Sequence, residues 1–410
     1  MPDGRTVGRP VTTDALRRLN TARVLRSLRD QGPASRALVA QRTGLAKATV
    51  GTIVADLQRS GAVEDGDAVP AARTSSRPAA AGRPGRPVTL AGAGIVGLGV
   101  EVNVGYLTAT ALDLAGRTVL SRRVSTESGL ELGSLRALTN QCWAQLVRQG
   151  ADVVGVDIAV PGLVARDKGV VVAAPNLHWT DVDLVHEIES SLPQLGSGRC
   201  RVRVDNDANC SAMAEATHGV ARGVDHVLFL TGTVGLGAGF VVQGRVQRGS
   251  TGFAGEVGHV PVGGADRRCA CGRRGCWETT VGLPAMLRAT GVRLRDADHD
   301  PMAAATEVAR RARTDASVRA GVREVGRWLG TGVVTIAGLL DPAMVVLGGY
   351  FVPLGSLLVP VVERALRGGL LGDGTRRCEV ALSTLGLGAA STGAASEVLT
   401  DVFDGVVALR

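Results

Sequence analysis

The first 60 residues repeat apolar side chains at helical spacing in three stretches, 14–30, 35–43 and 46–60. The third stretch is the clearest, because its apolar positions stand at i, i+3, i+4 and i+7: Val50, Ile53, Val54 and Leu57. The apolar positions of the first two stretches are Leu16, Leu19, Val24, Leu25, Leu28, Leu38 and Val39. The pattern predicts three amphipathic helices that pack into one small all-α unit.

The residues at the ends of these stretches have the chemistry of helix boundaries. Thr13 and Ser35 can cap the first two helices, Gly44 supplies a turn before the third, and Gly61 ends it. Ala46 stands at the cap position of the third helix and has no side-chain acceptor. Helix, short helix, glycine turn and helix is the order of a helix-turn-helix unit.

If the apolar stripe of the third helix is buried, its N-terminal half faces outward with Lys47, Ala48, Thr49 and Thr52. In a helix-turn-helix unit this end of the helix enters the major groove of DNA. A plain three-helix bundle with merely soluble outward residues is the alternative. The distribution of charge favours the DNA-binding interpretation. Residues 1–90 hold 15 Lys or Arg against 7 Asp or Glu, whereas residues 91–410 hold 31 of each.

The segment after Gly61 changes to Pro, Ala, Gly and Arg. A wing hairpin is expected within 62–69, so we expect a winged helix-turn-helix domain over 1–68. Residues 69–90 are interpreted as a linker. In its GRPGRP run, Arg83 and Arg86 stand on an extended backbone suited to a narrow minor groove, although a linker without DNA contacts is an equally good interpretation.

From residue 95 onward, short apolar runs alternate with glycine turns and helical patterns. Strands are expected at 95–102, 107–114, 119–124, 153–160, around 202 and at 227–233 and 344–347, and helices at 132–149, over 301–340 and from the Gly348-Gly349 turn to the C-terminus. This order fits an α/β protein of two lobes with a cleft between them.

Composition narrows the class of protein. At 410 residues, with 45% hydrophobic residues, the chain is long enough for two or three domains. It has no apolar run of 18 residues free of charges, and its N-terminus has no apolar signal segment. We therefore expect no membrane span and a cytoplasmic location.

Three of the seven cysteines, Cys269, Cys271 and Cys276, fall within eight residues, and His259 lies ten residues before the first of them. One imidazole and three thiolates make a closed tetrahedral set for a structural zinc ion. Catalytic zinc is not expected, because no coordination position stays open. A disulfide is the alternative, and a reducing compartment disfavours it.

The run GEVGH at 255–259, followed by CACGRRGCWE at 269–278, resembles the signature of the ROK family, which groups sugar kinases with sugar-responsive repressors. The resemblance covers nearly the whole chain, and QRTGLAKATVGTIVADL at 41–57 resembles the repressor version of the helix-turn-helix. It implies an α/β protein in which residues 91–410 form a two-lobed, actin-like or hexokinase-like ATPase fold that senses sugar, preceded by the winged helix-turn-helix domain.

The resemblance also implies a set of sugar-binding residues: Asn176, Asn206, Asp207, Glu256, His259 and Glu278. In the kinases of the family, the aspartate at the Asp207 position is the general base that deprotonates the attacking hydroxyl. Carboxylates and amides pair well with neighbouring hydroxyls, and leaving such a buried group unpaired costs about 1–3 kcal/mol. A polar turn that happens to hold acids is the alternative for residues 205–207.

At the positions where the kinases of the family bind the phosphates of ATP, this sequence differs from them. Where they carry D-x-G-G-T, this chain reads Glu101-Val102-Asn103-Val104-Gly105, so both glycines and the hydroxyl are replaced. In the second phosphate loop Val234 stands at the hydroxyl position, and Gly348-Gly349 matches the adenosine-side motif only weakly. We therefore expect no ATP, no enzyme activity and only a vestigial general base at Asp207.

These observations predict a sugar-responsive transcriptional regulator, in the simplest case a repressor. Its expected partners are a double-stranded DNA operator, a sugar or sugar-phosphate effector and further copies of itself in a homodimer or homotetramer, with no membrane. An ATP-dependent sugar kinase with an accessory DNA-binding domain is the alternative. A regulator that acts by binding a transport protein is a third interpretation.

Overall fold

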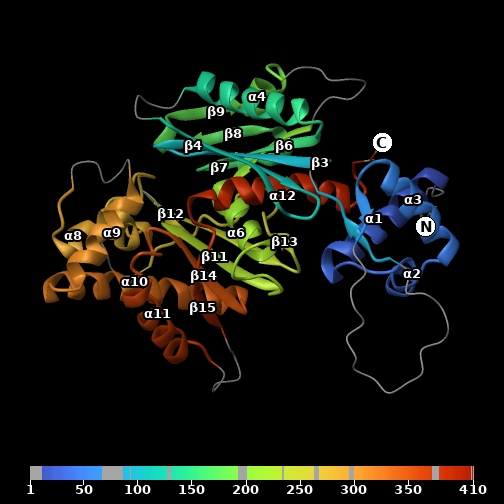
Figure 1. The fold of residues 1–410 in the computed structure, drawn as a ribbon. Coiled ribbons are helices and arrows are strands. Elements are labelled where there is room, and N and C mark those ends of the chain that lie inside the picture. The colour runs from blue at the N-terminus through green and yellow to red at the C-terminus, as the bar shows by residue number, and fades with distance from the viewer. Residues whose placement is uncertain are drawn as a thin grey trace, which may run out of the picture.

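The computed structural model describes residues 12–66, 86–92, 94–126, 131–192, 201–232, 235–262, 267–294, 300–371, 378–407 and 409. Figure 1 shows a small helical unit at the N-terminal end and two α/β lobes on either side of one long C-terminal helix. The expected α/β class, with two lobes preceded by a helical unit, is confirmed. None of the described helices is long and apolar enough to cross a membrane.

The N-terminal unit, here called the head, contains α1 (Thr13–Gln31), α2 (Arg36–Thr43) and α3 (Lys47–Arg59). All three helices lie where the apolar spacing predicts them. Ser35 caps α2 as expected, whereas α1 is capped by Thr12, whose hydroxyl accepts from the Ala15 N–H at 3.3 Å because Thr13 is already helical. Ala46 leaves α3 without a side-chain cap, as predicted.

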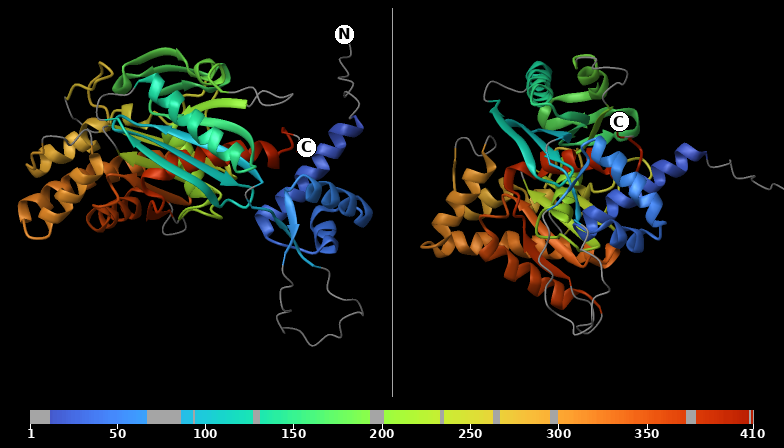
Figure 2. Two further views of the ribbon diagram at one scale, coloured as in Figure 1. Left: turned by 45° about the horizontal axis from the view of Figure 1, so that its top comes forward. Right: turned by 45° about the vertical axis from the view of Figure 1, so that its right-hand side comes forward.

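The apolar stripe of α1 is buried only in part. Val24, Leu25 and Leu28 are buried, whereas Leu16 and Leu19 are 50% and 42% exposed. The exposed pair lies in the first turns of α1, which extend beyond the rest of the head (Figure 2). Leu38 of α2 was also expected to point inward, and it is exposed as well.

The head is completed by a two-stranded antiparallel sheet, β1 (Val63–Asp65) with β2 (Val88–Leu90). The expected hairpin within 62–69 is therefore wrong, because the second strand comes from residues interpreted as the end of the linker. The physical reason is that Val88 and Leu90 bury apolar side chains in the head. Residues 67–85, including Arg83, lie outside the described residues.

The first lobe is built on a five-stranded mixed sheet in the order β10-β6-β3-β4-β5. Helices α4 and α5 belong to this lobe, and a small sheet, β7-β8-β9, extends it at the top of Figure 1. The bounds are β3 (Ile95–Val102), β4 (Tyr106–Asp113), β5 (Thr118–Ser125), α4 (Leu132–Arg148), β6 (Asp152–Val160), β7 (Leu163–Ala165), η1 (Arg166–Lys168), β8 (Val170–Ala174), η2 (Pro175–Leu177), β9 (Trp179–Asp183), α5 (Leu184–Glu189) and β10 (Arg201–Asn206).

The second lobe is built on another five-stranded sheet, in the order β13-β12-β11-β14-β15, with α7 to α11 packed around it. Strand β15 was not expected, because helices were predicted over this region. The bounds are α6 (Asp207–Thr217), β11 (His226–Gly232), β12 (Leu236–Val242), β13 (Arg245–Val246), η3 (Val257–His259), α7 (Glu278–Val281), α8 (Leu283–Thr290), α9 (Pro301–Ala312), α10 (Ala316–Leu340), β14 (Met344–Gly349), α11 (Gly355–Gly369), β15 (Glu379–Leu382) and η4 (Gly386–Gly388).

Helix α12 (Ala389–Phe403) joins the three parts of the molecule. It packs on α6 and on the first-lobe sheet so closely that a Cβ added to Gly393 would come 1.7 Å from the main-chain oxygen of Cys210. Its last turn reaches the head, where Val402 and Phe403 share one apolar core with α1, α2 and α3 (Figure 1). The head is therefore packed against the body through α12.

Candidate functional site

The junction of β10 and α6 positions the central pair of the predicted sugar site. Asn206 is the N-cap of α6, and its side-chain oxygen accepts from the N–H groups of Ala208 at 2.9 Å and Asn209 at 3.1 Å. Its amide nitrogen donates to the Gly162 carbonyl oxygen at 3.1 Å. These bonds fix the strand-to-helix turn and place Asp207 in the first turn of α6.

Asp207 lies in an environment that favours its neutral form. Burial raises the pKa of this carboxyl to about 6, against the lowering effect of a hydrogen bond from the Ala208 N–H at 2.8 Å, and the charge of Glu256 raises it further. Burial likewise raises the pKa of Glu256, which His259 lowers and Glu278 raises. A carboxyl group that titrates near neutrality can either accept or donate a hydrogen bond to a hydroxyl group.

A small hollow lies beside the Asn206–Asp207 turn. Asn206 and Glu256 both line it, together with Gly162–Val164 from the first lobe and Gly237, Ala238 and 252–255 from the second. Five of the six predicted sugar residues thus gather near one another, since His259 and Glu278 both lie within 4 Å of another member of the set. Asn176 is exposed on η2 and is not among the described residues that line the hollow.

The predicted metal ligands come together. His259, Cys269, Cys271 and Cys276 each offer a ligand atom, and these atoms lie within 4.8 Å of one another. The Sγ atoms of Cys271 and Cys276 are 3.6 Å apart, and the Cys269 Sγ is 3.6 Å from His259 Nδ1. A Zn–S bond of about 2.3 Å in a tetrahedron requires S···S separations of about 3.8 Å, so the residues fit a zinc ion. The Cys271–Cys276 separation is far longer than the ~2.05 Å of a disulfide.

The glycines between these cysteines allow the close backbone turns. Gly272 and Gly275 have φ of +85° and +75°, a region that favours glycine. The Cys269 N–H donates to the Arg273 oxygen at 2.8 Å, and the Gly272 N–H donates to the Cys269 oxygen at 3.0 Å. The turn therefore presents its sulfur atoms on one side.

The metal cluster adjoins the cleft. His259 Nδ1 faces the thiol of Cys269, while Nε2 lies 3.8 Å from a carboxylate oxygen of Glu256. Glu278 accepts from the Cys269 thiol at 2.7 Å and lies 3.6 Å from His259 Nδ1. One imidazole thus faces both the sulfur ligands and the predicted sugar pocket, which makes its two predicted roles compatible.

On the phosphate side, residues 101–106 form a closed turn. The Asn103 N–H donates to the Tyr106 oxygen at 2.9 Å, and the Val104 N–H donates to the Asn103 side chain at 2.8 Å. The Tyr106 hydroxyl donates to Glu101 at 2.8 Å. Burial raises the pKa of Glu101 to about 8, although the Tyr106 hydrogen bond opposes the shift. The N–H groups of Asn103 and Val104 are therefore already bonded within the turn.

The second phosphate segment is described only from Gly235 onward, since 233–234 lie outside the described residues. A Cβ at Gly235 would come 2.9 Å from a carboxylate oxygen of Glu278. The Gly348-Gly349 turn is explained by packing, because a Cβ at Gly348 would meet the Phe229 ring at 2.5 Å and one at Gly349 would meet the Gly232 oxygen at 2.1 Å.

In the head, the predicted DNA-contacting residues of α3 face solvent. Lys47, Ala48 and Thr52 are exposed and Thr49 is half-buried, while the opposite face of α3 packs into the core of the head. The Thr52 hydroxyl donates to the Ala48 oxygen at 3.2 Å. Arg86 is exposed just before β2.

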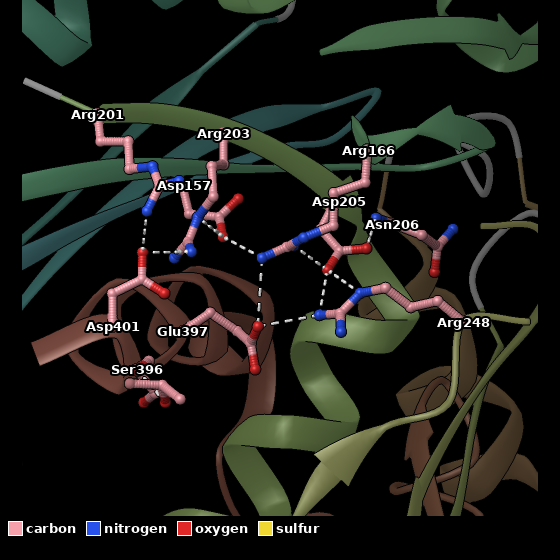
Figure 3. Close-up of polar contacts among 11 residues, drawn as sticks. Asp157, Arg166, Arg201, Arg203, Asp205, Asn206, Arg248, Ser396, Glu397 and Asp401 are labelled. Carbon is pink, nitrogen blue, oxygen red and sulfur yellow. Dashed lines mark hydrogen bonds and ion pairs between the residues drawn. The ribbon is translucent and has the colours of Figure 1, made fainter. Parts of the chain in front are cut away.

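One group of residues beside the predicted sugar site was not expected from the sequence. Asp205, directly before Asn206, is buried and accepts hydrogen bonds from Arg166 and Arg248. Arg248 also bonds Glu397 of α12 at 3.0 Å (Figure 3). The acids and arginines of this group are scattered from residue 157 to residue 401, so no local sequence signal joins them.

Comparison with known proteins agrees with this geometry. A family model described as the ROK family matches residues 97–400. The xylose repressor of Bacillus subtilis (strain 168) is 25% identical over 394 residues, which cover 95% of this chain and 97% of that protein. The glucokinase of Streptomyces coelicolor (strain ATCC BAA-471 / A3(2) / M145) is 29% identical over 315 residues, which cover 73% of this chain and 96% of the kinase.

The fold has a solved counterpart in a ROK family transcriptional regulator, a homolog of the E. coli MLC protein. It matches with a TM-score of 0.77 and 24% identity over 95% of this chain and 98% of the other.

The two lobes, the carboxylate cleft and the His/Cys cluster define a protein with the architecture of the sugar kinases, to which a helical head has been added. The chain belongs to the ROK family. The head precedes the residues that the family model matches, and the repressor match spans nearly the full chain whereas the glucokinase match covers part of it.

Proposed function

We propose that this protein is a sugar-responsive, DNA-binding transcriptional repressor that acts in the cytoplasm as a homo-oligomer. The observation that carries the proposal is the combination of two features. The chain has a helix-turn-helix head, and its body has the acids expected on the sugar side together with a phosphate-side turn, 101–106, that hydrogen-bonds to itself. The full-length similarity to a xylose repressor supports it. The direct test is binding of the protein to DNA from upstream of its own gene, across salt concentrations, with and without a panel of sugars and sugar phosphates.

The proposed DNA contacts are Lys47, Ala48, Thr49 and Thr52 in the major groove, with Arg83 and Arg86 near the minor groove. The exposure of Lys47, Ala48 and Thr52 supports the first group. Lys47→Ala is expected to weaken operator affinity about tenfold and to reduce its salt dependence, because a phosphate or base contact is lost. The matched control is Arg148→Ala at the exposed end of α4, which is expected to leave operator affinity unchanged.

The proposed effector is a sugar or sugar phosphate held by Asn206, Asp207, Glu256, His259 and Glu278, with Asn176 at the rim. Asn206 and Glu256 line one hollow, and His259 lies within 4 Å of both Glu256 and Glu278, which supports the assignment. Asp207→Ala is expected to retain operator binding and to lose the sugar response. Retention of that response would contradict the assignment of Asp207.

The metal site is proposed to hold structural zinc through His259, Cys269, Cys271 and Cys276. The closed N-and-S donor set and its tetrahedral spacing support this. Zinc would fix the segment between Glu256 and Glu278, so these two acids are held in place on both sides of the metal. The domain division 1–68, 69–90 and 91–410 is likewise proposed, with residues 88–90 reassigned to the head.

A sugar kinase is the second candidate, because Asp207 keeps the general-base position and its pKa is raised to about 6, a suitable value for proton transfer. Against it stands the turn at 101–106, in which the N–H groups of Asn103 and Val104 are already bonded. Incubation with ATP, Mg²⁺ and the same sugars distinguishes the two functions. Turnover of any sugar would overturn the proposal that the protein is not an enzyme.

A further inference from the structure

Between the cleft and α12 lies a group of eight charged side chains, here called the ion-pair cluster (Figure 3). Its members are Asp157, Arg166, Arg201, Arg203, Asp205, Arg248, Glu397 and Asp401. The carboxylates of Asp157 and Asp205 are almost fully buried. Four acids and four arginines balance in charge, so the cluster is electrically neutral as a whole.

One end of the ion-pair cluster belongs to the cleft. Asp205 accepts from the Asn206 N–H at 2.8 Å with one oxygen and from Arg248 at 2.6 and 2.9 Å with the other. The main-chain oxygen of Arg248 accepts from the Ala254 N–H at 3.0 Å, within the segment that lines the sugar pocket. A movement of either wall of the pocket therefore displaces a partner of Arg248.

The other end of the ion-pair cluster belongs to α12. Glu397 bonds Arg248 at 3.0 Å and Arg166 at 3.3 Å, and Asp401 bonds Arg203 at 2.8 Å. Two residues after Asp401, the ring of Phe403 lies 4.6 Å from the Arg29 guanidinium of α1. Since six residues of helix span about 9 Å, a shift of Glu397 is carried to the head by a rigid element.

The contact between head and body leaves room for such a shift. A hollow remains between α1, α3 and the C-terminal segment, and it is lined among others by Arg18, Leu57, Val402 and Leu409. Asp404 lies 3.8 Å from Arg26, a distance typical of a loose ion pair. The head therefore touches the end of α12 without being enclosed by it.

The pairing within the ion-pair cluster is incomplete. Both carboxylate oxygens of Asp157 are buried without a hydrogen-bond partner, and its nearest arginines, Arg166 and Arg203, are 3.5 Å away. Arg166 is shared among Asp157, Asp205 and Glu397. Buried ion pairs add little net stability over apolar packing, and our hypothesis for this cluster is a role in selecting between conformations.

We propose that the Asp205–Arg248–Glu397 bridge transmits occupancy of the sugar cleft to the DNA-binding head through α12. This inference rests on the proposed function and adds the route of its regulation. Sugar binding draws the 248–256 segment toward Asn206, changes the pairing of Arg248 with Glu397, and moves the end of α12 on which the head is packed. Arg248 and Glu397 are positioning residues, since neither is assigned a contact with sugar or DNA.

The test compares Glu397→Gln with the wild-type protein on the upstream DNA fragment. The probe is whichever of D-xylose, D-glucose, N-acetylglucosamine and their phosphates shifts the wild type most. In the wild type we expect a shift in operator Kd within the roughly 5–150-fold range of ordinary allosteric coupling. In Glu397→Gln that shift is expected to fall below about twofold. The sugar Kd of the DNA-free variant is expected to stay near the wild-type value.

Two controls separate coupling from stability. Glu363→Gln makes the same change in the Glu363–Arg367 pair of α11 and is expected to keep the full sugar effect. Because coupling between two binding sites is reciprocal, Glu397→Gln must also bind sugar equally well with and without DNA. A merely structural role would lower the melting temperature and leave both ratios intact.

If Glu397→Gln does not fold, the bridge is tested instead with Arg248→Lys and with hydrogen exchange of the wild type. A lysine cannot hold two carboxylates with a planar fork, so Arg248→Lys is expected to lose most of the sugar effect. In the wild type, sugar is expected to change hydrogen exchange at 397–404 as well as at 248–256. The bridge is overturned if folded Glu397→Gln or Arg248→Lys keeps the full sugar effect. It is also overturned if sugar leaves hydrogen exchange at 397–404 of the wild type unchanged. A wild type whose DNA binding no sugar shifts overturns the proposed function instead.

Discussion

At the residue scale, Asn206 and Asp207 have different roles in the same strand-to-helix turn. Asn206 uses its whole side chain to cap α6 and to hold Gly162, which follows the neighbouring parallel strand β6. Asp207 makes one local hydrogen bond and keeps an oxygen for other partners. The rigid asparagine therefore positions the aspartate, and the aspartate carries the proposed chemistry.

Asp207→Asn is expected to stabilise the protein at pH 8 about twice as much as at pH 5. The folded-state pKa of about 6 lies above the ordinary aspartate value of 3.8, so the stabilising contribution of Asp207 is complete only below pH 3.8 and is lost as the pH rises from there through 6. About two pKa units at 1.36 kcal/mol each set an upper limit near 3 kcal/mol for the gain. Urea unfolding at both pH values measures it, with the exposed Asp167→Asn as the control. Equal gains at pH 5 and pH 8 would contradict the assignment.

Cys276→Ser is expected to lose bound zinc and to lower the melting temperature. Cys276 is 1% exposed and close to Cys271, so serine would leave the cluster one thiolate short and bury a hydroxyl in its place. Metal analysis of the purified variant measures the loss. Cys378→Ser, outside the cluster, is the control and should retain the metal; normal zinc content in Cys276→Ser would remove it from the ligand set.

The sequence predicts local chemistry well and dispersed chemistry poorly. His259, Cys269, Cys271 and Cys276 lie within one short segment, and their spacing alone predicted the cluster that the structure forms. The bridge of Asp205, Arg248 and Glu397 was not predicted, because its partners come from β10, a loop and α12. Such pairs are set by tertiary packing, and arginine and acid residues are too common to mark them.

At the element scale, α12 is the helix on which the packing of the two lobes depends. It lies against α6 and the first-lobe sheet without space for side chains at its contact points, and its Ser391 hydroxyl pairs with that of Thr110 at 2.8 Å. Elements with long periodic patterns, such as α1, α3 and α10, were predictable. Four-residue β15 was missed, because so short a strand offers too few positions for a periodic signal.

Gly393→Ala is expected to destabilise the protein by about 3 kcal/mol or more. The added Cβ would meet the main chain of α6, which cannot move without separating the two helices, and this is the severe end of overpacking. Chemical denaturation measures the loss. Gly388→Ala, just before α12, has no atom within 4 Å of the added Cβ and is expected to stay near wild-type stability. Similar values for the two variants would show that α12 packs differently.

At the scale of the whole molecule, the head and the body are joined through a shared apolar core. Val24, Leu25 and Leu28 of α1 belong to the same buried cluster as Val402 and Phe403 of α12. Two segments from opposite ends of the chain thus meet in one place (Figure 2). Sequence periodicity predicted the head and the lobes separately, and it gave no information on this contact between them.

Phe403→Ala is expected to release the head from α12 while leaving the lobes folded. Phe403 is 4% exposed and lies under the Arg29 guanidinium, so its removal costs about 3–5 kcal/mol of packing, mostly at the head. Hydrogen exchange should rise in α1 to α3 and stay low in β3 and β6. Leu371→Ala, at a side chain that is 90% exposed, is the control and should change neither. Unchanged exchange in the head would mean that the contact contributes little.

The shared core has a consequence for protein engineering. A head transplanted from another regulator as residues 12–66 and 86–90 would arrive without the C-terminal turn that completes its interior. Its buried face would meet Leu399, Val402 and Phe403 of the host, which are shaped for different neighbours. Chimeras intended to pair a new operator with an existing effector should therefore exchange the last turns of α12 together with the head.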